Sequence, residues 1–302
     1  MRVPDPNSQK GEFILYNGPM NSGKTETLVK HSKNLKDHAS QNVQAFSILE
    51  NTRDGLNQIV GDNGDRLDAI SIPMNNPEFI LDHVYKLDKI RRVDVVSIDE
   101  IGFFIYNIIP VIRTLKKEDR VILAATINKS FRGEDFGVVP YLLGLADPRS
   151  LESTTFNSYC KLIVNNRQCS NPATYTVRLS RDSDFKVDFF DKQNNVIEGY
   201  GFAPYFDPLK VFEEKKQSGF KQREYTTACK SCFKIPFMQE TFDVYNSLIR
   251  GINVRDIDFE YVSDVVNMLF DENKIKSLGK GYYSAREHVF DINSGVFIPK
   301  GL

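Results

Sequence analysis

Residues 18–25 read GPMNSGKT and match the full eight-residue pattern of a phosphate-binding loop. The glycines let the backbone turn its N–H groups toward phosphate oxygens, Lys24 adds a positive charge, and the Thr25 hydroxyl can ligate Mg²⁺. A helix after the loop would offer its positive end to the same anion. A plain glycine-rich turn is the alternative. The pattern predicts a nucleotide site made by Gly18, Met20, Asn21, Ser22, Gly23, Lys24 and Thr25.

An acidic pair ends a later apolar run, VVSIDE at residues 95–100. Asp99 is placed to hold Mg²⁺, directly or through water, together with Thr25. Glu100 lies just beyond the run, where it could take a proton from an attacking hydroxyl or water. A solvated loop carboxylate is the alternative for Glu100. Together, the loop and the acids indicate phosphoryl transfer or nucleotide hydrolysis.

The strands and helices of the fold must position these residues. Near-continuous Val, Ile and Leu runs at 12–17, 43–50, 93–100 and 119–126 predict buried strands, and residues 24–36 carry a helical pattern. Such runs, separated by helical lengths, are typical of a parallel sheet covered on both faces. The fold class predicted is α/β, with a P-loop sheet flanked by helices.

The composition changes near residue 150, which suggests four parts. We expect a flexible tail (1–11), a nucleotide-binding domain (12–150), a small β-rich domain with all four cysteines (151–239), and a C-terminal extension (240–302). Within the β-rich part, residues 174–179 (TYTVRL) look like a strand. In the extension, residues 263–277 predict an amphipathic helix capped by Gly279.

Overall composition excludes several classes of protein. The chain has 302 residues and a formal net charge of −1, which argues against nucleic acid as a partner. Its longest apolar stretch, residues 103–112, is about half a bilayer span, so we expect no membrane segment. The N-terminus lacks the apolar core of a signal peptide, which predicts a cytoplasmic protein with reduced cysteines.

Several short motifs, in order over residues 11–235, resemble the type II thymidine kinases. They are GPM-x-SGKT, DEIGFF at 99–104, AATINKSFRGEDFG followed by LLGLAD at 124–147, CSNPATYTVRL at 169–179, and YTTACKSC at 225–232. The resemblance implies a RecA-like P-loop domain, a small zinc-bearing domain, and transfer of phosphate from ATP to a deoxynucleoside, most of all thymidine. It also implies a homo-oligomer, commonly a tetramer.

The resemblance assigns roles to individual residues. Glu100 would deprotonate the nucleoside 5′-hydroxyl, and Arg53 would stabilise charge near the reacting phosphate; a surface arginine is the alternative. A "lasso" loop in the small domain would close over the nucleoside, chiefly with backbone groups. Its segment here, 179–223, is much longer than usual and suggests an inserted hairpin. The substrate-contact positions are Met20, Phe103, Phe131, Phe136, Thr176 and Tyr225; for each phenylalanine alone, core packing is the alternative.

Four cysteines suit a closed, tetrahedral structural zinc site. Cys229 and Cys232 form a close pair in CKSC, whereas eight residues separate Cys160 from Cys169. Cys160 would have to reach back through a hairpin in KLIVNNRQ. The alternative is four unrelated buried cysteines. The expected cofactors are therefore ATP, Mg²⁺ and a structural Zn²⁺.

The chain departs from the family pattern in three places. Ile101 and Gly102 stand where a small residue and glutamine are usual, Thr126 stands where leucine is usual, and Gly61-Asp62 replace a Ser-His pair. These departures leave open another deoxynucleoside or a degenerate relative without activity. A P-loop ATPase that couples hydrolysis to a protein or nucleic-acid partner is the alternative from another class.

Overall fold

The computed structural model describes residues 11–51, 55–148, 155–191, 193–209, 223–279 and 282–285. The described chain divides into two compact units. Unit 1 comprises Met1–Arg178, Val187–Glu198 and Phe212–Phe233, and unit 2 comprises Leu179–Lys186, Gly199–Val211 and Lys234–Leu302. The predicted tail, apart from Gly11, lies outside the described residues. The division into four parts by sequence stays a prediction.

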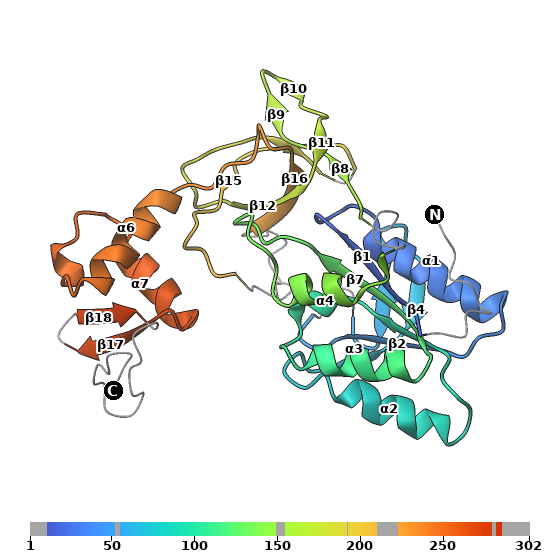
Figure 1. Ribbon diagram of the computed structural model, residues 1–302. Coiled ribbons are helices and arrows are strands. Elements are labelled where there is room, and N and C mark those ends of the chain that lie inside the picture. The colour runs from blue at the N-terminus through green and yellow to red at the C-terminus, as the bar shows by residue number, and fades with distance from the viewer. Residues whose placement is uncertain are drawn as a thin grey trace. The chain divides into compact units, whose positions relative to one another are not determined.

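Unit 1 is built on a five-stranded sheet in the order β1-β7-β6-β2-β5 (Figure 1). Every neighbouring pair in it is parallel. The predicted α/β class with a parallel sheet is therefore confirmed. The strands of this sheet are β1 (Phe13–Gly18), β2 (Val43–Ile48), β5 (Ile70–Ile72), β6 (Val95–Ile98) and β7 (Val121–Ile127). Because all five run the same way, their carboxyl ends meet at one edge, where open α/β sheets bind ligands.

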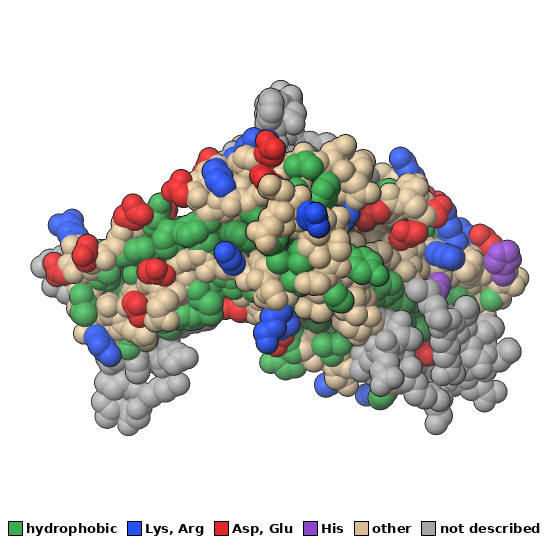
Figure 2. Space-filling model, turned by 90° about the horizontal axis from the view of Figure 1, so that it is seen from above, with side chains coloured by type: hydrophobic (Ala, Val, Ile, Leu, Met, Phe, Trp, Pro, Cys, Tyr) green, Lys and Arg blue, Asp and Glu red, His purple; other side chains and the backbone are tan. Residues whose placement is uncertain are grey.

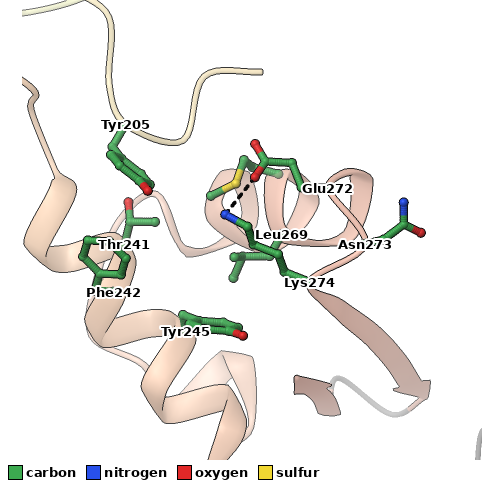
Figure 3. A pocket seen from close by; sticks show the side chains of 9 residues that line it. Tyr205, Thr241, Phe242, Tyr245, Leu269, Glu272, Asn273 and Lys274 are labelled. Carbon is green, nitrogen blue, oxygen red and sulfur yellow. Dashed lines mark ion pairs between the residues drawn. The ribbon is translucent and has the colours of Figure 1, made fainter. Parts of the chain in front are cut away.

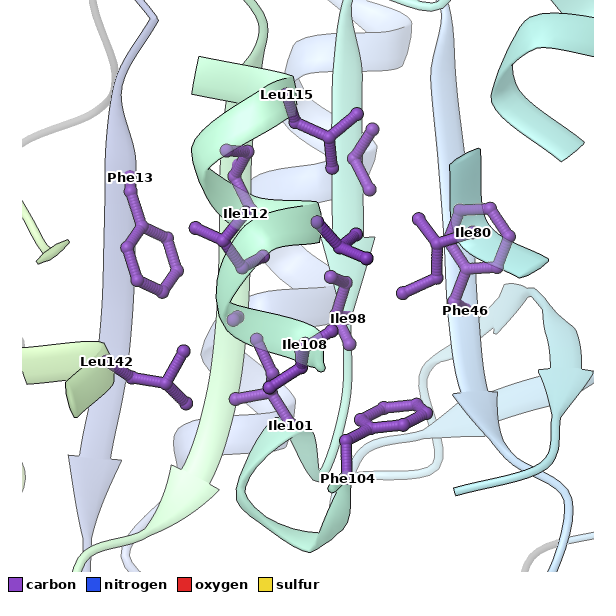
Figure 4. Packing of buried hydrophobic residues seen from close by; sticks show 14 of the residues in the cluster. Phe13, Phe46, Ile80, Ile98, Ile101, Phe104, Ile108, Ile112, Leu115 and Leu142 are labelled. Carbon is purple, nitrogen blue, oxygen red and sulfur yellow. The ribbon is translucent and has the colours of Figure 1, made fainter. Parts of the chain in front are cut away.

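Helices cover both faces of the sheet, which explains the unbroken apolar runs in the sequence. Figure 4 shows one face, where Ile80, Ile112 and Leu142 pack on Phe13 and Ile98 of the sheet. The other face is covered by α1 and a two-stranded hairpin, β3–β4. The elements around the sheet are α1 (Lys24–Asp37), β3 (Gln58–Val60), β4 (Arg66–Asp68), α2 (Phe79–Asp88), the 3-10 turn η1 (Ile101–Phe103), α3 (Ile108–Lys117) and α4 (Val139–Leu145).

The four cysteines lie outside the strands of their region, in the segments that follow β8, β10 and β16. In β9 and β10 the chain turns back on itself, with Asn165 and Asn166 both in the left-handed region (φ 51° and 60°) that a tight two-residue hairpin needs. The hairpin predicted between Cys160 and Cys169 is confirmed. The strands of this region are β8 (Ser158–Tyr159), β9 (Ile163–Val164), β10 (Arg167–Gln168), β11 (Pro172–Ala173), β12 (Tyr175–Ser180), β13 (Phe189–Phe190), β14 (Val196–Ile197) and β16 (Arg223–Ala228).

The long lasso segment does contain a hairpin, as predicted: β13 pairs antiparallel with β14. The stretches on either side of this hairpin belong to unit 2, where β15 pairs with the end of β12. The remaining elements of unit 2 come from the extension. They are β15 (Gly201–Phe202), α6 (Met238–Ile249), the 3-10 turn η2 (Val254–Asp256), α7 (Val262–Asp271), β17 (Ile275–Gly279) and β18 (Tyr282–Ala285).

Unit 2 has its own core, in which residues 199–209 of the long lasso segment, called the inserted segment below, pack on the C-terminal extension. Tyr205 and Phe206 lie buried among Leu248 of α6 and Val265 and Leu269 of α7. Figure 2 shows hydrophobic side chains gathered on the surface of this part, with acidic side chains beside them. The aromatic run GYGFAPYFDP (residues 199–208) thus contributes Tyr205 and Phe206 to a packed core.

The helix predicted at 263–277 is wrong at its C-terminal end, because α7 ends at Asp271 and Gly279 lies in β17. Asn273 adopts the left-handed conformation (φ 55°), and the Lys274 N–H donates to the Leu269 carbonyl at 2.8 Å. This is the hydrogen bond that closes a helix at a left-handed residue. Asn273, which the sequence analysis passed over, is therefore the cap, and β17 begins two residues later.

Candidate active site

The phosphate loop runs from the end of β1 to the start of α1. Gly23 adopts φ 83° at the N-cap of α1, a conformation that glycine adopts without steric cost. The Lys24 ammonium is nearly buried and donates to the Pro19 carbonyl at 2.6 Å. The Ser22 hydroxyl donates to the same carbonyl at 2.9 Å. The lysine side chain is thus held inside the loop, next to the N-terminal end of α1, which attracts anions.

The acidic pair lies across from this loop, at the end of β6. The Thr25 hydroxyl donates to Asp99 Oδ1 at 3.2 Å, which places the two predicted magnesium ligands next to each other. Glu100 adopts φ 54° and ψ 35°, a left-handed conformation that costs a non-glycine residue about 1–2 kcal/mol. Such strain is typical of functional sites, where the surrounding fold maintains it.

One small cavity gathers most of the residues predicted for phosphate chemistry. Met20, Asn21, Ser22, Gly23, Lys24 and Thr25 line it together with Asp99 and Glu100. Further lining residues, missed as site residues by the sequence analysis, are Glu26, Val60, Asp62, Thr126 and Ile127. Asp62 and Val60 come from the β3–β4 hairpin and its turn, whose strands of three residues are too short to give a periodic signal.

Two of the departures from the family pattern lie against each other in the structure. The Gly102 N–H donates to the Thr126 hydroxyl at 3.2 Å, and both residues are buried. A Cβ on residue 102 would lie 2.3 Å from Thr126 Oγ1 and 2.9 Å from Val139 Cγ2. Only glycine fits at this position while Thr126 keeps its conformation. The two substitutions therefore form one local arrangement.

The aromatic side chains predicted to contact a nucleoside fall into two groups. Phe103 and Phe136 pack edge to face, with ring centroids 4.7 Å apart. The guanidinium carbon of Arg178 lies over the ring of Phe131, 4.0 Å from the centroid of that ring. The Arg178 Nε donates to the Tyr225 hydroxyl at 2.9 Å. None of the four rings is among the described residues that line the phosphate-loop cavity.

Arg178 was missed because a lone arginine in a strand gives no functional signal. Its side chain is only 3% exposed, and cation–π stacking together with a hydrogen bond offsets part of the cost of burying it. Arg178 thus holds two of the predicted contact residues, Phe131 and Tyr225, in fixed positions.

A hydrogen bond joins the phosphate loop to β12. The Met20 N–H donates to the Thr176 hydroxyl at 3.0 Å, and Thr176 is 1% exposed in β12. Both residues were predicted to contact substrate. Arg53, the other predicted catalytic residue, lies outside the described residues.

The four cysteines come together as one cluster. Their sulfur atoms all lie within 4.8 Å of one another, and Cys169 Sγ is 3.7 Å from Cys229 Sγ. A tetrahedral zinc site with Zn–S bonds of about 2.3 Å has sulfur atoms about 3.8 Å apart. All four are free thiols, Cys160 and Cys229 buried and the other two half-buried. The donor set and its spacing fit a structural zinc ion.

Hydrogen bonds lower the pKa of one thiol in the cluster. Burial alone would raise the pKa of Cys229, but hydrogen bonds from the Cys232 and Ser231 N–H groups and from neighbouring thiols lower it to about 7. Burial, with hydrogen bonds to Cys169 and Cys229, raises the pKa of Cys232. Four thiols in one place cannot all ionise without a cation, and zinc would supply that charge.

Comparison with known proteins points in one direction. A family model described as thymidine kinase matches residues 11–201. A thymidine kinase of Coprothermobacter proteolyticus is 34% identical over 172 residues, which cover 57% of this chain and 77% of that protein. The family match ends before α6, so α6 and α7 of unit 2 lie outside it. Among the described residues, no helix is long and apolar enough to span a membrane.

Proposed function

Since this chain belongs to the thymidine kinase family, we propose that it transfers the γ-phosphoryl group of ATP to the 5′-hydroxyl of thymidine. As a family member it is a nucleoside kinase; thymidine and ATP are the specific substrates proposed here. The observation that carries the proposal is the cavity in which the phosphate loop faces Asp99 and Glu100.

The triphosphate would lie in the phosphate loop. Backbone N–H groups of residues 20–25 would bind its oxygens, and Lys24 would leave the Pro19 carbonyl to pair with the β and γ phosphates. Thr25 and Asp99 would ligate Mg²⁺, since their side chains already meet at 3.2 Å. A bound Mg²⁺ would neutralise charge that develops on the phosphate oxygens.

Glu100 would act as the general base. The 5′-hydroxyl oxygen forms a bond to the γ-phosphorus as its proton passes to the Glu100 carboxylate, and the bond between this phosphorus and the bridging oxygen to the β-phosphate breaks. The products are thymidine monophosphate and ADP. The strained backbone at Glu100 would fix its carboxylate relative to the end of β6.

The base of the nucleoside would contact the aromatic side chains near the site. Phe103 follows Glu100 through the single turn η1, and Phe131 and Tyr225 are held by Arg178. Flat apolar rings suit a nucleobase because stacking needs no charge. The cluster of four cysteines would hold zinc as a structural element of the strands that carry Thr176 and Tyr225.

A panel assay tests the proposal. Purified protein with Mg-ATP is incubated with thymidine, deoxyuridine, deoxycytidine, deoxyadenosine or deoxyguanosine, and nucleoside monophosphate and ADP are quantified separately. We expect thymidine monophosphate and ADP in equal amounts, with thymidine the best acceptor. ADP without a phosphorylated nucleoside would overturn the proposal in favour of an ATPase.

Glu100→Gln tests the proposed base. General bases contribute about 10²–10⁴-fold to rate, so turnover should fall by that factor while ATP binding, measured by calorimetry, is retained. The matched control is Glu26→Gln, because Glu26 lines the same cavity from α1 without a proposed role. Equal activity of the two variants would remove Glu100 from the mechanism.

A further inference from the structure

Unit 2 contains a second cavity, outside the phosphate site. Its volume is about 340 Å³, and three segments line it: the inserted segment, α6, and α7 with the turn that follows (Figure 3). The lining residues are Tyr205, Thr241, Phe242, Tyr245, Met268, Leu269, Glu272, Asn273 and Lys274. Ligand sites commonly begin at about 300 Å³. The cavity is therefore large enough for a molecule of nucleoside size.

Aromatic rings form one side of this cavity. Phe242 and Tyr245 project from α6, and Tyr205 faces them from the inserted segment, with its ring centroid 5.4 Å from that of Phe242 (Figure 3). Leu269 and Met268 of α7 add apolar surface. Phe242 is 37% exposed, so a face of the wall remains open to a ligand. Such a wall favours a flat, aromatic ligand that can stack.

An ion pair forms the other side. The Lys274 ammonium lies 3.0 Å from Glu272 Oε2, and in Figure 3 the Lys274 side chain reaches toward the aromatic wall while Asn273 points away. A carboxylate accepts several hydrogen bonds and an ammonium donates three, so each group can bind a ligand while the pair is kept. The side chain of Thr241 is committed to the Phe237 carbonyl at 2.7 Å.

We propose that this cavity binds a nucleobase through stacking and through its lactam edge. A lactam presents an N–H donor beside a carbonyl acceptor, which matches the carboxylate of Glu272 beside the ammonium of Lys274. The pair is neutral overall, which favours a neutral ligand. A charged ligand would gain little, because its attraction to one member of the pair is largely cancelled by repulsion from the other. A plain hydrocarbon would shield the charged pair from water without compensation.

The absence of tryptophan from the chain allows a site-specific test. In Phe242→Trp the single tryptophan lies in the cavity wall, so its fluorescence reports on this cavity and not on the phosphate site. The full-length variant is titrated with thymine, and with toluene, a ring of similar size without the lactam edge. We expect saturable quenching by thymine and at least tenfold weaker binding of toluene.

Matched variants separate the cavity from the rest of the surface. Phe270→Trp puts the reporter on the same unit, at an exposed position that does not line the cavity, and should show no saturable change. Adding Glu272→Gln to Phe242→Trp should weaken thymine binding at least tenfold, whereas adding Glu240→Gln, which lies outside the cavity, should not. Circular dichroism checks folding, and Tyr245→Trp serves as a second reporter if Phe242→Trp does not fold.

Three results would each overturn the proposal. They are an unchanged signal with both wall reporters, equal affinity for toluene and thymine, and unchanged thymine binding in the Glu272→Gln background.

Discussion

The core of unit 1 lies between a parallel sheet and helices on both of its faces, whereas the core of unit 2 lies between two helices and an aromatic segment inserted from elsewhere in the chain. In unit 1, neighbouring residues of one strand belong to the apolar clusters on opposite faces of the sheet, as Ile14 and Leu15 do. In unit 2, Phe206 stacks on Phe237 and Tyr261, with ring centroids 6.0 and 5.5 Å apart.

The difference lies in which elements supply the apolar surface of each core. Each strand of the unit 1 sheet brings its own apolar surface, and the cysteine cluster adds a second, separate means of holding the strands beyond the sheet. Unit 2 depends on a few aromatic side chains from a distant segment. Metal removal should therefore affect only unit 1, and loss of an aromatic ring in the insertion should affect only unit 2.

The largest effect is expected from Cys229→Ser. Structural zinc contributes about 10 kcal/mol or more to small metal-dependent folds, so the strands around the cluster should lose most of their stability. Bound zinc, measured by atomic absorption, should fall from one ion per chain to none. Hydrogen exchange should rise in residues 158–173 and 223–233 but not in α6 and α7.

Ser231→Ala is the control for the cysteine variant, because its backbone N–H, which bonds to Cys229, is kept. Unchanged zinc content in Cys229→Ser, or equal loss in both variants, would contradict a four-cysteine zinc site. A rise in exchange throughout α6 and α7 would mean that the two units do not unfold separately.

The next largest effect is expected from Phe206→Ala in unit 2. Removing a buried phenylalanine costs about 3–5 kcal/mol, and Phe206 is only 9% exposed. Hydrogen exchange should rise in α6 and α7, while the nucleoside kinase rate at about 20 °C, well below the usual unfolding range of such domains, is kept. The control is Phe270→Ala, since Phe270 is 51% exposed and should cost less than about 0.5 kcal/mol.

Loss of kinase activity in Phe206→Ala would contradict the independence of the two cores. It would show that the inserted segment acts on the phosphate site through β12 and β16, the strands that precede and follow this segment in the sequence. Retained activity with a loosened unit 2 would support two independent cores.

A smaller effect, confined to unit 1, is expected from Asp88→Asn. The buried Arg120 guanidinium donates to both Asp88 oxygens, at 3.1 and 2.5 Å, and these hydrogen bonds hold the pKa of Asp88 below its ordinary value. The stabilisation is therefore full above about pH 4, the ordinary carboxyl pKa, and is lost as the pH falls through the lowered pKa of the folded state.

The Asp88→Asn variant should be less stable than the wild type by about 1.5–3 kcal/mol at about pH 7, the range for hydrogen bonds to a charged group, because Arg120 keeps its ion pair with Glu118. The gap should close in acid. Urea unfolding at a series of pH values from neutral down to about pH 2 measures this gap. Asp82→Asn, on the exposed side of the same helix, should give no such gap. A constant difference across the pH range would exclude the Arg120 pair as its cause.

The smallest effect is expected from Gly102→Ala, which should cost about 1–3 kcal/mol by overpacking against Thr126. Thr126→Ala in the same chain should recover part of this loss, because it removes the nearest atom. Additive costs in the double variant would mean that the two residues are not coupled. Gly144→Ala, where an added Cβ meets no atom within 4 Å, is the control and should not destabilise.

Sequence patterns predicted unit 1 well because its signals are local. The phosphate loop, the acidic pair after β6 and the helix α1 each depend on residues within one element or its neighbour. The Cys160–Cys169 hairpin was also predictable, since the metal-ligand pattern demanded a reversal and Asn165-Asn166 permits one. The roles of the individual site residues stay predictions.

Unit 2 could not be predicted in the same way. Tyr205 is 40 residues before Tyr245 in the sequence, and nothing local marks either as part of one core. The end of α7 was misplaced because Gly279 is a more familiar helix cap than Asn273. Buried Arg178 was missed since its ring contacts come from Phe131 and Tyr225, which are distant in the sequence.

The inserted aromatic segment is synthesised well before part of the core on which it packs. Phe206 leaves the ribosome before Leu269, its partner in the unit 2 core, and 63 residues separate the two positions. At about 5–20 residues per second, translation leaves Tyr205 and Phe206 without that partner for about 3–13 seconds. Nascent chains of this protein are therefore open to chaperones and to aggregation at this segment. Slow codons between residues 207 and 269 would lengthen that interval.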